Sequence, residues 1–489
     1  MSETPLTFSG NPAILIERLT AVVGEDNCLS RPEELFTYGC DGLTLDAHRP
    51  SVVVLPKSSQ EVAAAVAICR ELGCPFVPRG AGTGLSGGAT PLFGAVVICC
   101  SRMGEILEID AENRIAVVQP GVVNAHLSRA VADLGLFYAP DPSSQQACTI
   151  GGNVAENSGG PHTLKYGTTT NHVLAVEMVL PDASTVRLGS PTGFSPGYDL
   201  VGAVVGSEGT LGIVTEITVR LMAIPEAVET ILAIFDDVPS ACRLVGGIIR
   251  SGMVPAALEV VDQRTIRAVE ASVYAAGLPT EAGAVLIIEL DGAACEMEGQ
   301  LARIRALARD EGVRDLRIAA NAEERTLFWR ARKGAFGAMG RLAPDLYVHD
   351  AVVPRASLPE VLEEICAIGD RYSLKLSNVF HAGDGNLHPN ISFDRRDPDE
   401  LARVLAAGRE MLELCVRVGG VLTGEHGVGT EKRDYMGMLF TPDDLDAMRR
   451  LRDAFNPDGL CNPGKLIPTT RACMESNPKA RGYDEVPLE

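Results

Sequence analysis

The feature that most constrains the fold is a glycine-dense segment that follows a short apolar strand pattern at 75–78. Five of the nine residues from 80 to 88 are glycine, and GTGLSG within this run fits the GxGxxG spacing. A Rossmann site needs a helix that begins inside that motif, and Gly88 and Pro91 prevent one. The segment therefore predicts an extended loop whose N–H groups can cradle a pyrophosphate, with Arg79 adding charge-assisted hydrogen bonds. An ordinary flexible loop is the alternative.

A β-α-β pattern leads into this loop. Residues 51–55 predict a strand and 58–72 a helix, with Ser58 as the N-cap and Glu61 completing a capping box. Further strands are predicted at 95–99, 106–109, 115–119, 173–180, 184–188 and 211–222, and further helices at 11–23 and 123–135.

The sequence pattern changes after Pro225. Apolar runs at 229–235 and 284–290 are separated by long Ala-rich helix patterns, which predicts an α+β second unit. The predicted boundaries are 1–222 for the first domain, 223–420 for a substrate or cap domain, and 421–489 for a C-terminal segment that returns to the active site.

Charge and cysteine content exclude several classes of protein. Acidic residues outnumber basic ones by 64 to 43, a formal net charge of −21, which argues against nucleic acid or an anionic membrane as the main partner. The 13 cysteines include no CxxC pair, so reduced and mostly buried thiols are expected. Residues 1–5 give no signal-peptide pattern, and no apolar run approaches the roughly 18 residues of a membrane span. A cytoplasmic protein without a direct span is expected.

Two further polar, glycine-rich clusters lie at 141–160 and 206–215. Glycines allow a planar ring to approach the backbone closely, and the Asn, Ser and Thr residues among them can form neutral hydrogen bonds to its heteroatoms. Together with the loop after Arg79, these clusters are hard to explain as turns alone.

Three of the eight histidines lie in two short motifs, HAGDGNLHPN (381–390) and GEHGVG (424–429). The Gly-Asp-Gly-Asn turn predicts a hairpin that folds His381 back toward His388. Two imidazoles and a carboxylate are a common ligand set for a divalent metal. Turn-forming polar residues and a lone core histidine are the alternative.

The chain resembles the FAD-binding domain of the vanillyl-alcohol oxidase / p-cresol methylhydroxylase superfamily. The strings that carry the resemblance are PRGAGTGLSGG (78–88), APDPSSQQACTIGGNVAENSGG (139–160), LKYG (164–167) and GSEGTLGIVTE (206–216). The resemblance covers roughly 15–470 and is closest to the branch that holds the catalytic subunit of glycolate oxidase and the D-lactate and D-2-hydroxyglutarate dehydrogenases. It implies an α+β fold, with a two-subdomain PCMH-type FAD-binding domain and an α+β FAD-linked oxidase C-terminal domain.

The resemblance implies an FAD site. Some members of the superfamily tether the flavin through a histidine, but 79–91 holds no His, Cys or Tyr. His162 remains a conceivable tether, and noncovalent FAD is the expectation. The implied FAD-binding residues are Arg79, Gly80, Ala81, Gly82, Thr83, Gly84, Leu85, Ser86, Gly87, Pro142, Ser143, Gly151, Gly152, Asn153, Asn157, Gly159, Gly160, Glu208, Gly209, Gly212, Ile213, Asn386 and Asn462.

The two histidine motifs match the metal-binding motifs of the 2-hydroxyacid branch. The implied ligands of a divalent metal (Zn, Mn or Fe) are His381, His388 and Glu425, and the implied catalytic residues are His426 as base, Arg332 and Asn390. Arg332 follows Trp329 by three residues and would meet the substrate carboxylate, whereas Arg330 and Lys333 are expected on the surface.

The resemblance also addresses substrate and partners. Members specific for dicarboxylates carry a Thr where Phe336 stands and a Lys near Val348, so a small 2-hydroxy acid, glycolate or D-lactate, is favoured. No iron–sulfur ligand set exists in the chain, which implies a glycolate oxidase catalytic subunit that works with flavoprotein-like and iron–sulfur subunits and a quinone-linked acceptor, with membrane association through those partners. A stand-alone D-lactate dehydrogenase and a non-catalytic flavin-binding subunit are the alternatives.

Overall fold

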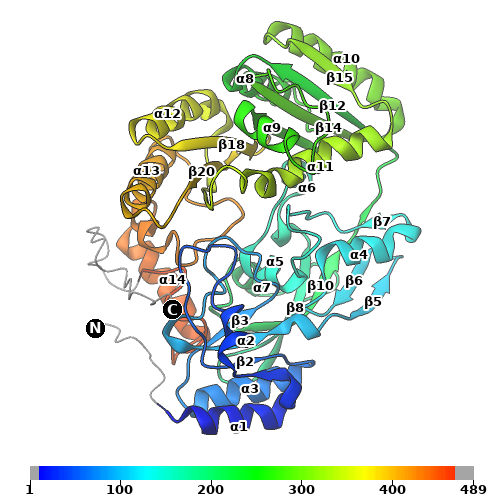
Figure 1. Cartoon of the computed structure of the whole chain (residues 1–489). Coiled ribbons are helices and arrows are strands. Elements are labelled where there is room, and N and C mark those ends of the chain that lie inside the picture. Colours follow the sequence, from blue (N-terminus) through cyan, green and yellow to red (C-terminus); the bar gives the residue numbers. More distant parts are fainter. Residues whose placement is uncertain (1–9, 469–489) are drawn as a thin grey trace.

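The computed structural model describes residues 10–468, arranged around two sheets in the first part of the chain and one large sheet in the second (Figure 1). Residues 1–5, on which the signal-peptide expectation rests, lie outside this range. So do the first residues of the predicted 1–222 domain and the last residues of the predicted 421–489 segment. Nine of the twelve described cysteines are buried and all twelve are free. No helix between residues 10 and 468 is long and apolar enough to cross a membrane.

Both sheets of the first domain come from residues 28–220. The four-stranded sheet runs β1 (Cys28–Leu29), β2 (Val53–Val54), β4 (Val96–Cys99), β3 (Phe76–Arg79). The five-stranded sheet runs β5 (Ile106–Asp110), β6 (Ile115–Val118), β10 (Ile213–Arg220), β8 (Val173–Val179), β9 (Thr185–Gly189). Strand β3 pairs in parallel with β4, so the glycine-dense loop leaves the carboxyl end of a parallel pair.

The nine-stranded sheet of the C-terminal domain is built of antiparallel pairs. Its strands are β12 (Ala227–Phe235), β13 (Ala257–Asp262), β14 (Ala284–Gly292), β15 (Asp315–Ile318), β16 (Asp345–Val348), β17 (Ala351–Val352), β18 (Lys375–His381), β19 (Asn386–Leu387) and β20 (Pro389–Phe393). A short pair joins β7 (Leu136–Phe137) to β11 (Met222–Ala223) near the domain boundary.

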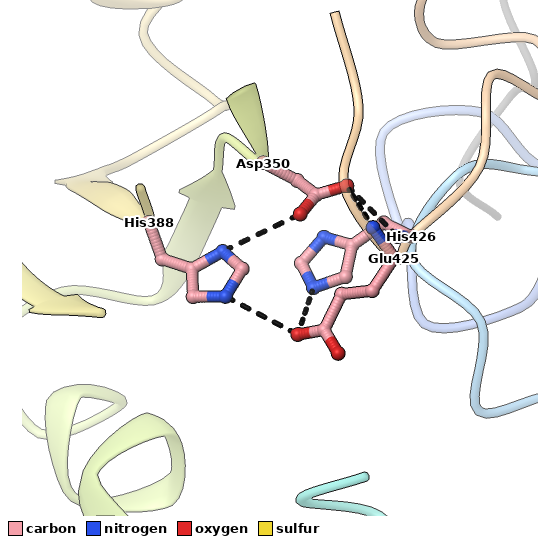
Figure 2. Close-up of side chains that lie close together, drawn as sticks. All are labelled: Asp350, His388, Glu425 and His426. Atoms are coloured by element: carbon pink, nitrogen blue, oxygen red, sulfur yellow. Dashed lines mark hydrogen bonds and ion pairs between the residues drawn. The ribbon is translucent and has the colours of Figure 1, made fainter. Parts of the chain in front are cut away.

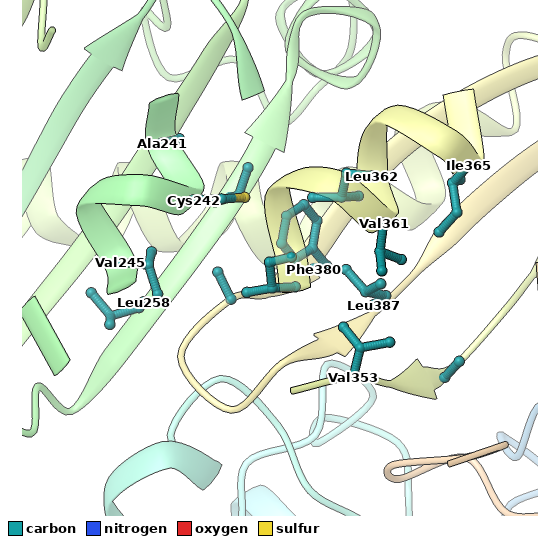
Figure 3. Packing of buried hydrophobic residues seen from close by; sticks show 14 of the residues in the cluster. Ala241, Cys242, Val245, Leu258, Val353, Val361, Leu362, Ile365, Phe380 and Leu387 are labelled. Atoms are coloured by element: carbon teal, nitrogen blue, oxygen red, sulfur yellow. The ribbon is translucent and has the colours of Figure 1, made fainter. Parts of the chain in front are cut away.

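Helices cover both faces of the large sheet. Along β12, Ile231 and Ala233 belong to the core under α8 (Val238–Arg250), α10 (Ala294–Asp310), α12 (Leu358–Arg371) and α13 (Pro398–Arg417). Leu232 and Ile234 belong to the core under α9 (Gln263–Glu270) and α11 (Ala322–Met339). This alternation follows from the period of two along a strand. Figure 3 shows the first core, where Cys242 and Leu362 lie with Phe380 and Leu387.

The helices are α1 (Pro12–Val23), α2 (Pro32–Phe36), α3 (Ser59–Glu71), α4 (Asn124–Val131), α5 (Ile150–Glu156), α6 (Thr163–Tyr166), α7 (Leu200–Val204), α8 (Val238–Arg250), α9 (Gln263–Glu270), α10 (Ala294–Asp310), α11 (Ala322–Met339), α12 (Leu358–Arg371), α13 (Pro398–Arg417) and α14 (Pro442–Phe455).

Local sequence signals predicted many of these elements, and two of the differences have a clear physical reason. Ser58 caps α3 as expected, but the Glu61 carboxylate accepts from the Lys57 N–H, so no capping box forms. Helix α5 lies in a stretch that reads as polar loop, because Gly151 and Gly152 lower its helix propensity. The Thr149 hydroxyl caps this helix by accepting the Gly152 N–H at 3.3 Å.

The end of the described chain returns to the first domain. Cys461 forms a parallel bridge to Phe76 on β3, next to the glycine-dense loop. The Asn462 amide then donates to the carbonyls of Gly88 (2.9 Å) and Glu208 (2.7 Å). Because these residues belong to two separate loops of the first domain, the C-terminal segment braces both.

Candidate active site

A cavity of about 360 Å³ lies between the first domain and the C-terminal domain. Residues 80–85 and 142–144 form part of one wall, and Arg332, His388 and His426 form part of the opposite wall. A cavity of this size falls within the range of small-molecule and cofactor sites.

The glycine-dense loop is extended, as predicted, and its conformation requires glycine at position 82. Gly82 has φ of +70°, and a Cβ there would lie 2.1 Å from Nη2 of Arg79. The Arg79 guanidinium donates to the Cys40 carbonyl at 2.8 Å and lies over the Tyr38 ring. Arg79 therefore supports the loop from behind, outside the large cavity.

A second cavity of about 60 Å³ continues behind the loop. The two cavities share the lining residues Pro78, Gly80, Thr149, Gly152, Ala155 and Gly209. Among the predicted FAD-binding residues, the small cavity alone is lined by Arg79, Gly151, Gly212 and Ile213. Those that line the large cavity are Gly80, Ala81, Gly82, Thr83, Gly84, Leu85, Pro142, Ser143, Gly152, Asn153, Glu208 and Gly209.

The remaining predicted FAD-binding residues lie outside both linings, namely Ser86, Gly87, Asn157, Gly159, Gly160, Asn386 and Asn462. Several of them hold loops together. The Ser86 carbonyl accepts the Thr430 and Glu431 N–H groups, and the Asn157 side chain accepts the Thr170 N–H at 2.9 Å. These hydrogen bonds hold together the loops that surround the cavity.

Two buried carboxylates in the cavity wall, Asp41 and Glu156, were not found from the sequence, whereas Glu208 was. Burial raises the pKa of Asp41, Glu156 and Glu208, and it lowers the pKa of the nearby Lys465 to about 8. The Glu208 carboxylate accepts the Val428 and Gly429 N–H groups at 2.6 and 2.7 Å. Glu208 thus ties the GSEGTLG segment of the first domain to the GEHGVG turn.

The predicted hairpin brings the two histidines of the first motif together. Asn386 pairs with His381 across β18 and β19, and the His381 and His388 ring centroids are 5.1 Å apart. The Nε2 atoms of His381 and His388 lie 3.1 and 3.2 Å from the same oxygen, Oε1 of Glu425. The three predicted metal ligands therefore converge on one point.

Each of these histidines has its other nitrogen fixed by an acceptor. Nδ1 of His381 lies 2.8 and 2.9 Å from the two carboxylate oxygens of Glu259, and Nδ1 of His388 lies 3.1 Å from the His349 carbonyl. Without a cation, the Nε2 atoms of His381 and His388 can carry protons and donate to Glu425. With a cation bound beside Glu425, an N–H at each Nδ1 would leave each Nε2 lone pair available as a ligand, the usual arrangement of a metal-ligating histidine. The sequence reasoning missed Glu259, although an acidic residue inside the apolar strand ALEVVD is a signal of a paired buried charge.

The ionisable side chains of this cluster shift one another's pKa values. Burial alone would raise the pKa of Glu425, but the His381 imidazole beside it and the hydrogen bonds from His381 and His388 hold that pKa well below its usual range. Burial lowers the pKa of His426 to about 4. The His426 ring stacks on the His388 ring with centroids 4.9 Å apart.

Asp350 anchors the second motif (Figure 2). Its Oδ2 accepts the N–H groups of Gly424, Glu425 and His426 at 3.0, 3.1 and 2.8 Å, and also the Thr423 hydroxyl. Asp350, His388, Glu425 and His426 each offer a ligand atom within 4.8 Å of the others. Sequence reasoning missed Asp350.

Helix α11 carries three residues that matter for the cavity. Arg332 lines it and pairs through Nη2 with Oε2 of Glu259 at 2.6 Å, while its Nε has no hydrogen-bond partner within residues 10–468. Lys333, expected on the surface, also lines the cavity and lies 2.8 Å from Asp141. Phe336 lines the cavity near Tyr274.

Asn390, predicted as catalytic, is buried behind the cavity lining. Its amide donates to the His388 carbonyl at 2.6 Å, and it stands opposite Val348 across β16 and β20. Its position supports the backbone of His388.

The residues present fit both groups that the resemblance implies. Two imidazole lone pairs and a carboxylate converge, and the neighbouring Oδ1 of Asp350 and Nδ1 of His426 are buried without a hydrogen-bond partner in the part of the chain that the structure describes. Such a donor set suits a divalent cation. On the opposite side, glycines whose Cβ would collide with protein atoms, such as Gly80 (2.4 Å from the Thr149 hydroxyl), keep the loop backbone close to the cavity.

Comparison with protein families also gives an FAD-binding part followed by a C-terminal part. Residues 50–189 match the FAD binding domain family, and residues 224–466 match the family of FAD linked oxidases, C-terminal domain. p-Cresol methylhydroxylase with substrate bound has the same fold, with a TM-score of 0.81 and 18% identity over 94% of this chain and 97% of that protein. The fold and these matches define a two-domain, FAD-linked oxidoreductase.

Similar proteins include the glycolate oxidase subunit GlcD of Escherichia coli (strain K12), which is 48% identical over 91% of this chain and 89% of the relative. GlcD of Bacillus subtilis (strain 168) is 41% identical over 92% and 96%, and a D-lactate dehydrogenase of Anaerostipes hadrus is 33% identical over 86% and 90%. The protein belongs to the GlcD family of glycolate oxidase subunits.

Proposed function

We propose that this protein oxidises a small 2-hydroxy acid, glycolate or D-lactate, to the 2-oxo acid, with noncovalent FAD as the acceptor and a divalent metal (Zn, Mn or Fe) at His381, His388 and Glu425. One observation carries the proposal. The cavity that the glycine loops of the FAD-binding domain line on one side is lined by Arg332, His388 and His426 on the other.

Arg332 binds the substrate carboxylate in this proposal. It is buried, with 5% of its side chain exposed, and Glu259 holds only one end of its guanidinium. The unpartnered Nε leaves donor capacity on the side chain that lines the cavity. A carboxylate can take two parallel hydrogen bonds from such a guanidinium, which orients the substrate.

His426 accepts the proton of the substrate hydroxyl in this proposal. Its ring lines the cavity beside the convergent ligands, and Asp350 fixes its backbone through the N–H at 2.8 Å. Oxidation of the alcohol releases one proton and one hydride, so the imidazole accepts the proton as general base. Adjacent positions on one turn let Glu425 face the metal position while His426 faces the substrate.

The bound groups supply the remaining chemistry. His381, His388 and Glu425 would hold the cation, which would supply a Lewis acid for the substrate hydroxyl. The 80–85 loop would hold the FAD, which would supply the hydride acceptor. His162 is not the flavin tether in this proposal, because carboxylates engage both of its ring nitrogens.

The wall around Arg332 is apolar, which favours a small substrate. Tyr274, Phe336, Val348 and Val379 line it, and the ammonium of Lys333 in the same wall is already paired with Asp141 at 2.8 Å. A second substrate carboxylate would lose its hydration against these apolar side chains without a charged partner among them. D-2-hydroxyglutarate is therefore expected to be a poor substrate.

Electrons must leave the reduced flavin, and the 489-residue sequence holds no iron–sulfur ligand set. The proposal therefore includes flavoprotein-like and iron–sulfur partner subunits and a quinone-linked acceptor, reached through those partners. A stand-alone D-lactate dehydrogenase remains the second candidate, supported by the similarity to the D-lactate dehydrogenase of Anaerostipes hadrus.

The test is anaerobic flavin bleaching. The purified protein is analysed for metal and then mixed with glycolate, D-lactate, L-lactate or D-2-hydroxyglutarate. We expect glycolate or D-lactate to bleach the flavin, and His426→Ala to abolish bleaching while FAD remains bound. The control is His126→Ala, an exposed histidine on α4. Bleaching by none of the four acids would overturn the proposed function.

A further inference from the structure

The short α6 segment of the first domain docks against the C-terminal domain through a set of charged side chains. Lys165 and Tyr166 both bind the Asp291 carboxylate at the end of β14. Leu164 packs into the C-terminal core beside Gly383. This segment follows the glycine-rich cluster that helps to line the cavity, so its docking sets the spacing between the two walls.

His162 lies at the centre of this interface, between carboxylates from both domains. Its Nδ1 is 2.9 Å from Oδ2 of Asp141 in the first domain, and its Nε2 is 2.8 Å from Oε1 of Glu289 on β14. The exposed fractions of the three side chains are 20%, 13% and 9%. Two carboxylates accept at both ring nitrogens only if both carry a proton, which makes the ring an imidazolium.

The same cluster holds helix α11. Lys333 binds Asp141 at 2.8 Å, and Trp329 one turn earlier donates its indole N–H to Glu289. The Trp329 ring lies 5.3 Å from the His162 ring, tilted by 36°. Arg332 lies directly between these two positions in the sequence, so the contacts that fix Trp329 and Lys333 also fix the backbone that carries Arg332.

We propose that His162 is a positioning residue, which as an imidazolium joins Asp141 of the first domain to Glu289 of the C-terminal domain and so places Arg332 opposite the flavin wall of the cavity. The proposal rests on the proposed function only in the role given to Arg332. It accounts for the two acceptors on one ring and for the convergence of Trp329 and Lys333 on the same pair of carboxylates.

The charges around His162 agree with this role. Burial alone would lower its pKa, but Asp141 and Glu289 raise the pKa to about 10. The facing charged groups are Asp141 from the loop after β7, Glu289 on β14 and Lys333 on α11. Lys165 on α6 is paired with Asp291 and does not reach the ring.

The first test compares His162→Gln with the control His126→Gln in the FAD-loaded protein. Loss of the imidazolium leaves Asp141 and Glu289 without the cation between them, so α6 and α11 should dock less firmly. We expect faster hydrogen exchange in 160–166 and in α11, a KM for the 2-hydroxy acid raised about 10-fold or more, and a smaller change in kcat. Partial return of exchange protection in the double variant His162→Gln/Glu289→Gln would identify charge as the cause. Unchanged exchange in both segments would overturn the proposal.

The second test reads the charge of the ring directly. Trp329 is the single tryptophan of the protein, and a protonated imidazole quenches an adjacent indole more strongly than a neutral one. Wild-type emission should therefore rise as the pH passes about 10, the value for His162, and His162→Gln should lack this step. Flavin and tyrosine titrations occur in both proteins and cancel in the comparison. The same pH curve for both proteins would overturn the proposal.

These outcomes are separable from the fate of the proposed function. Hydrogen exchange and tryptophan emission need no substrate. A protein that bleaches with no 2-hydroxy acid but shows the emission step and the exchange difference would refute the proposed activity and leave the domain-joining role of His162 supported. Normal turnover with a KM unchanged in His162→Gln would refute the positioning role and leave the proposed activity intact.

Discussion

Arg332 and Glu259 form a buried ion pair, with 2.6 Å between Nη2 and Oε2 and side-chain exposures of 5% and 1%. The same carboxylate faces Nδ1 of His381 at 2.8 and 2.9 Å. One glutamate on β13 therefore orients both the proposed substrate-binding arginine and a proposed metal ligand. A change at Glu259 should for that reason affect both the substrate site and the metal site.

Glu259→Gln tests this link. Glutamine keeps the shape but removes the charge, which leaves the Arg332 guanidinium buried without its counter-charge. We expect a loss of about 3–5 kcal/mol in unfolding free energy, measured by urea denaturation. Metal affinity should also fall about 10- to 100-fold, measured by metal content at fixed chelator concentration, because His381 loses its orienting acceptor. The exposed Glu108→Gln is the control. Wild-type metal content in Glu259→Gln would contradict the link.

Asp350→Ala tests the anchor of the GEHGVG turn. The substitution leaves the backbone N–H groups of Glu425 and His426 without their acceptor, whereas the Gly424 N–H keeps the Asp350 carbonyl at 3.0 Å. Each unsatisfied buried donor costs about 1–3 kcal/mol, so a loss of about 2 kcal/mol or more is expected. Exchange of the Glu425 and His426 amides should become faster, whereas the exposed Asp133→Ala should change neither quantity. Protected amides in Asp350→Ala would rule out the anchoring role.

The pH dependence of the unfolding free energy should reveal the protonation of His162. Its pKa is raised from 6.5 to about 10 in the folded protein, so the folded state holds the proton more tightly than the unfolded state. The stabilisation is complete below about pH 6.5 and is lost as the pH rises through about 10. The difference in unfolding free energy between wild type and His162→Gln should be at least about 1.4 kcal/mol at pH 6, one pKa unit's worth, and should shrink toward pH 10. A difference that stays constant over this range would contradict the assignment.

Local signals predicted the parts of the site that are close in sequence. The Gly-Asp-Gly-Asn turn indicated the hairpin, and the register of His381 opposite Asn386 confirms it. The glycines at 80–88 indicated an extended loop rather than a helix, because Gly88 and Pro91 cannot continue one, and the structure agrees.

Long-range partners could not be predicted in the same way. Glu259 and His381 are 122 residues apart, and only the pairing of β13 with β18 brings them together. The charge of Arg79 suggested a role in the cavity, whereas its guanidinium faces Cys40 and Tyr38. Charge and spacing indicate that a residue needs a partner, but the partner depends on strand order, which one sequence does not specify.

Gly84→Ala tests whether the large cavity is the FAD site. Gly84 lines the cavity, and a Cβ at this position would meet protein atoms no closer than 3.7 Å, so the folded protein should accept the methyl group without strain. The methyl group instead occupies space beside the loop backbone, where the cofactor must approach closely. We expect FAD affinity to fall about 10-fold or more, measured by equilibrium dialysis, while the thermal midpoint of the FAD-free protein stays within about 2 °C of wild type.

Gly299→Ala on α10 is the matched control, because a Cβ there meets nothing within 4 Å and the residue does not line the cavity. It should leave FAD affinity unchanged and should not lower the thermal midpoint, because alanine favours a helix over glycine. Wild-type FAD affinity in Gly84→Ala would mean that the cofactor does not lie against this loop. A lowered midpoint without FAD would instead show that the methyl group disturbs the fold, and Gly84 would then be a structural residue and not a contact of the cofactor.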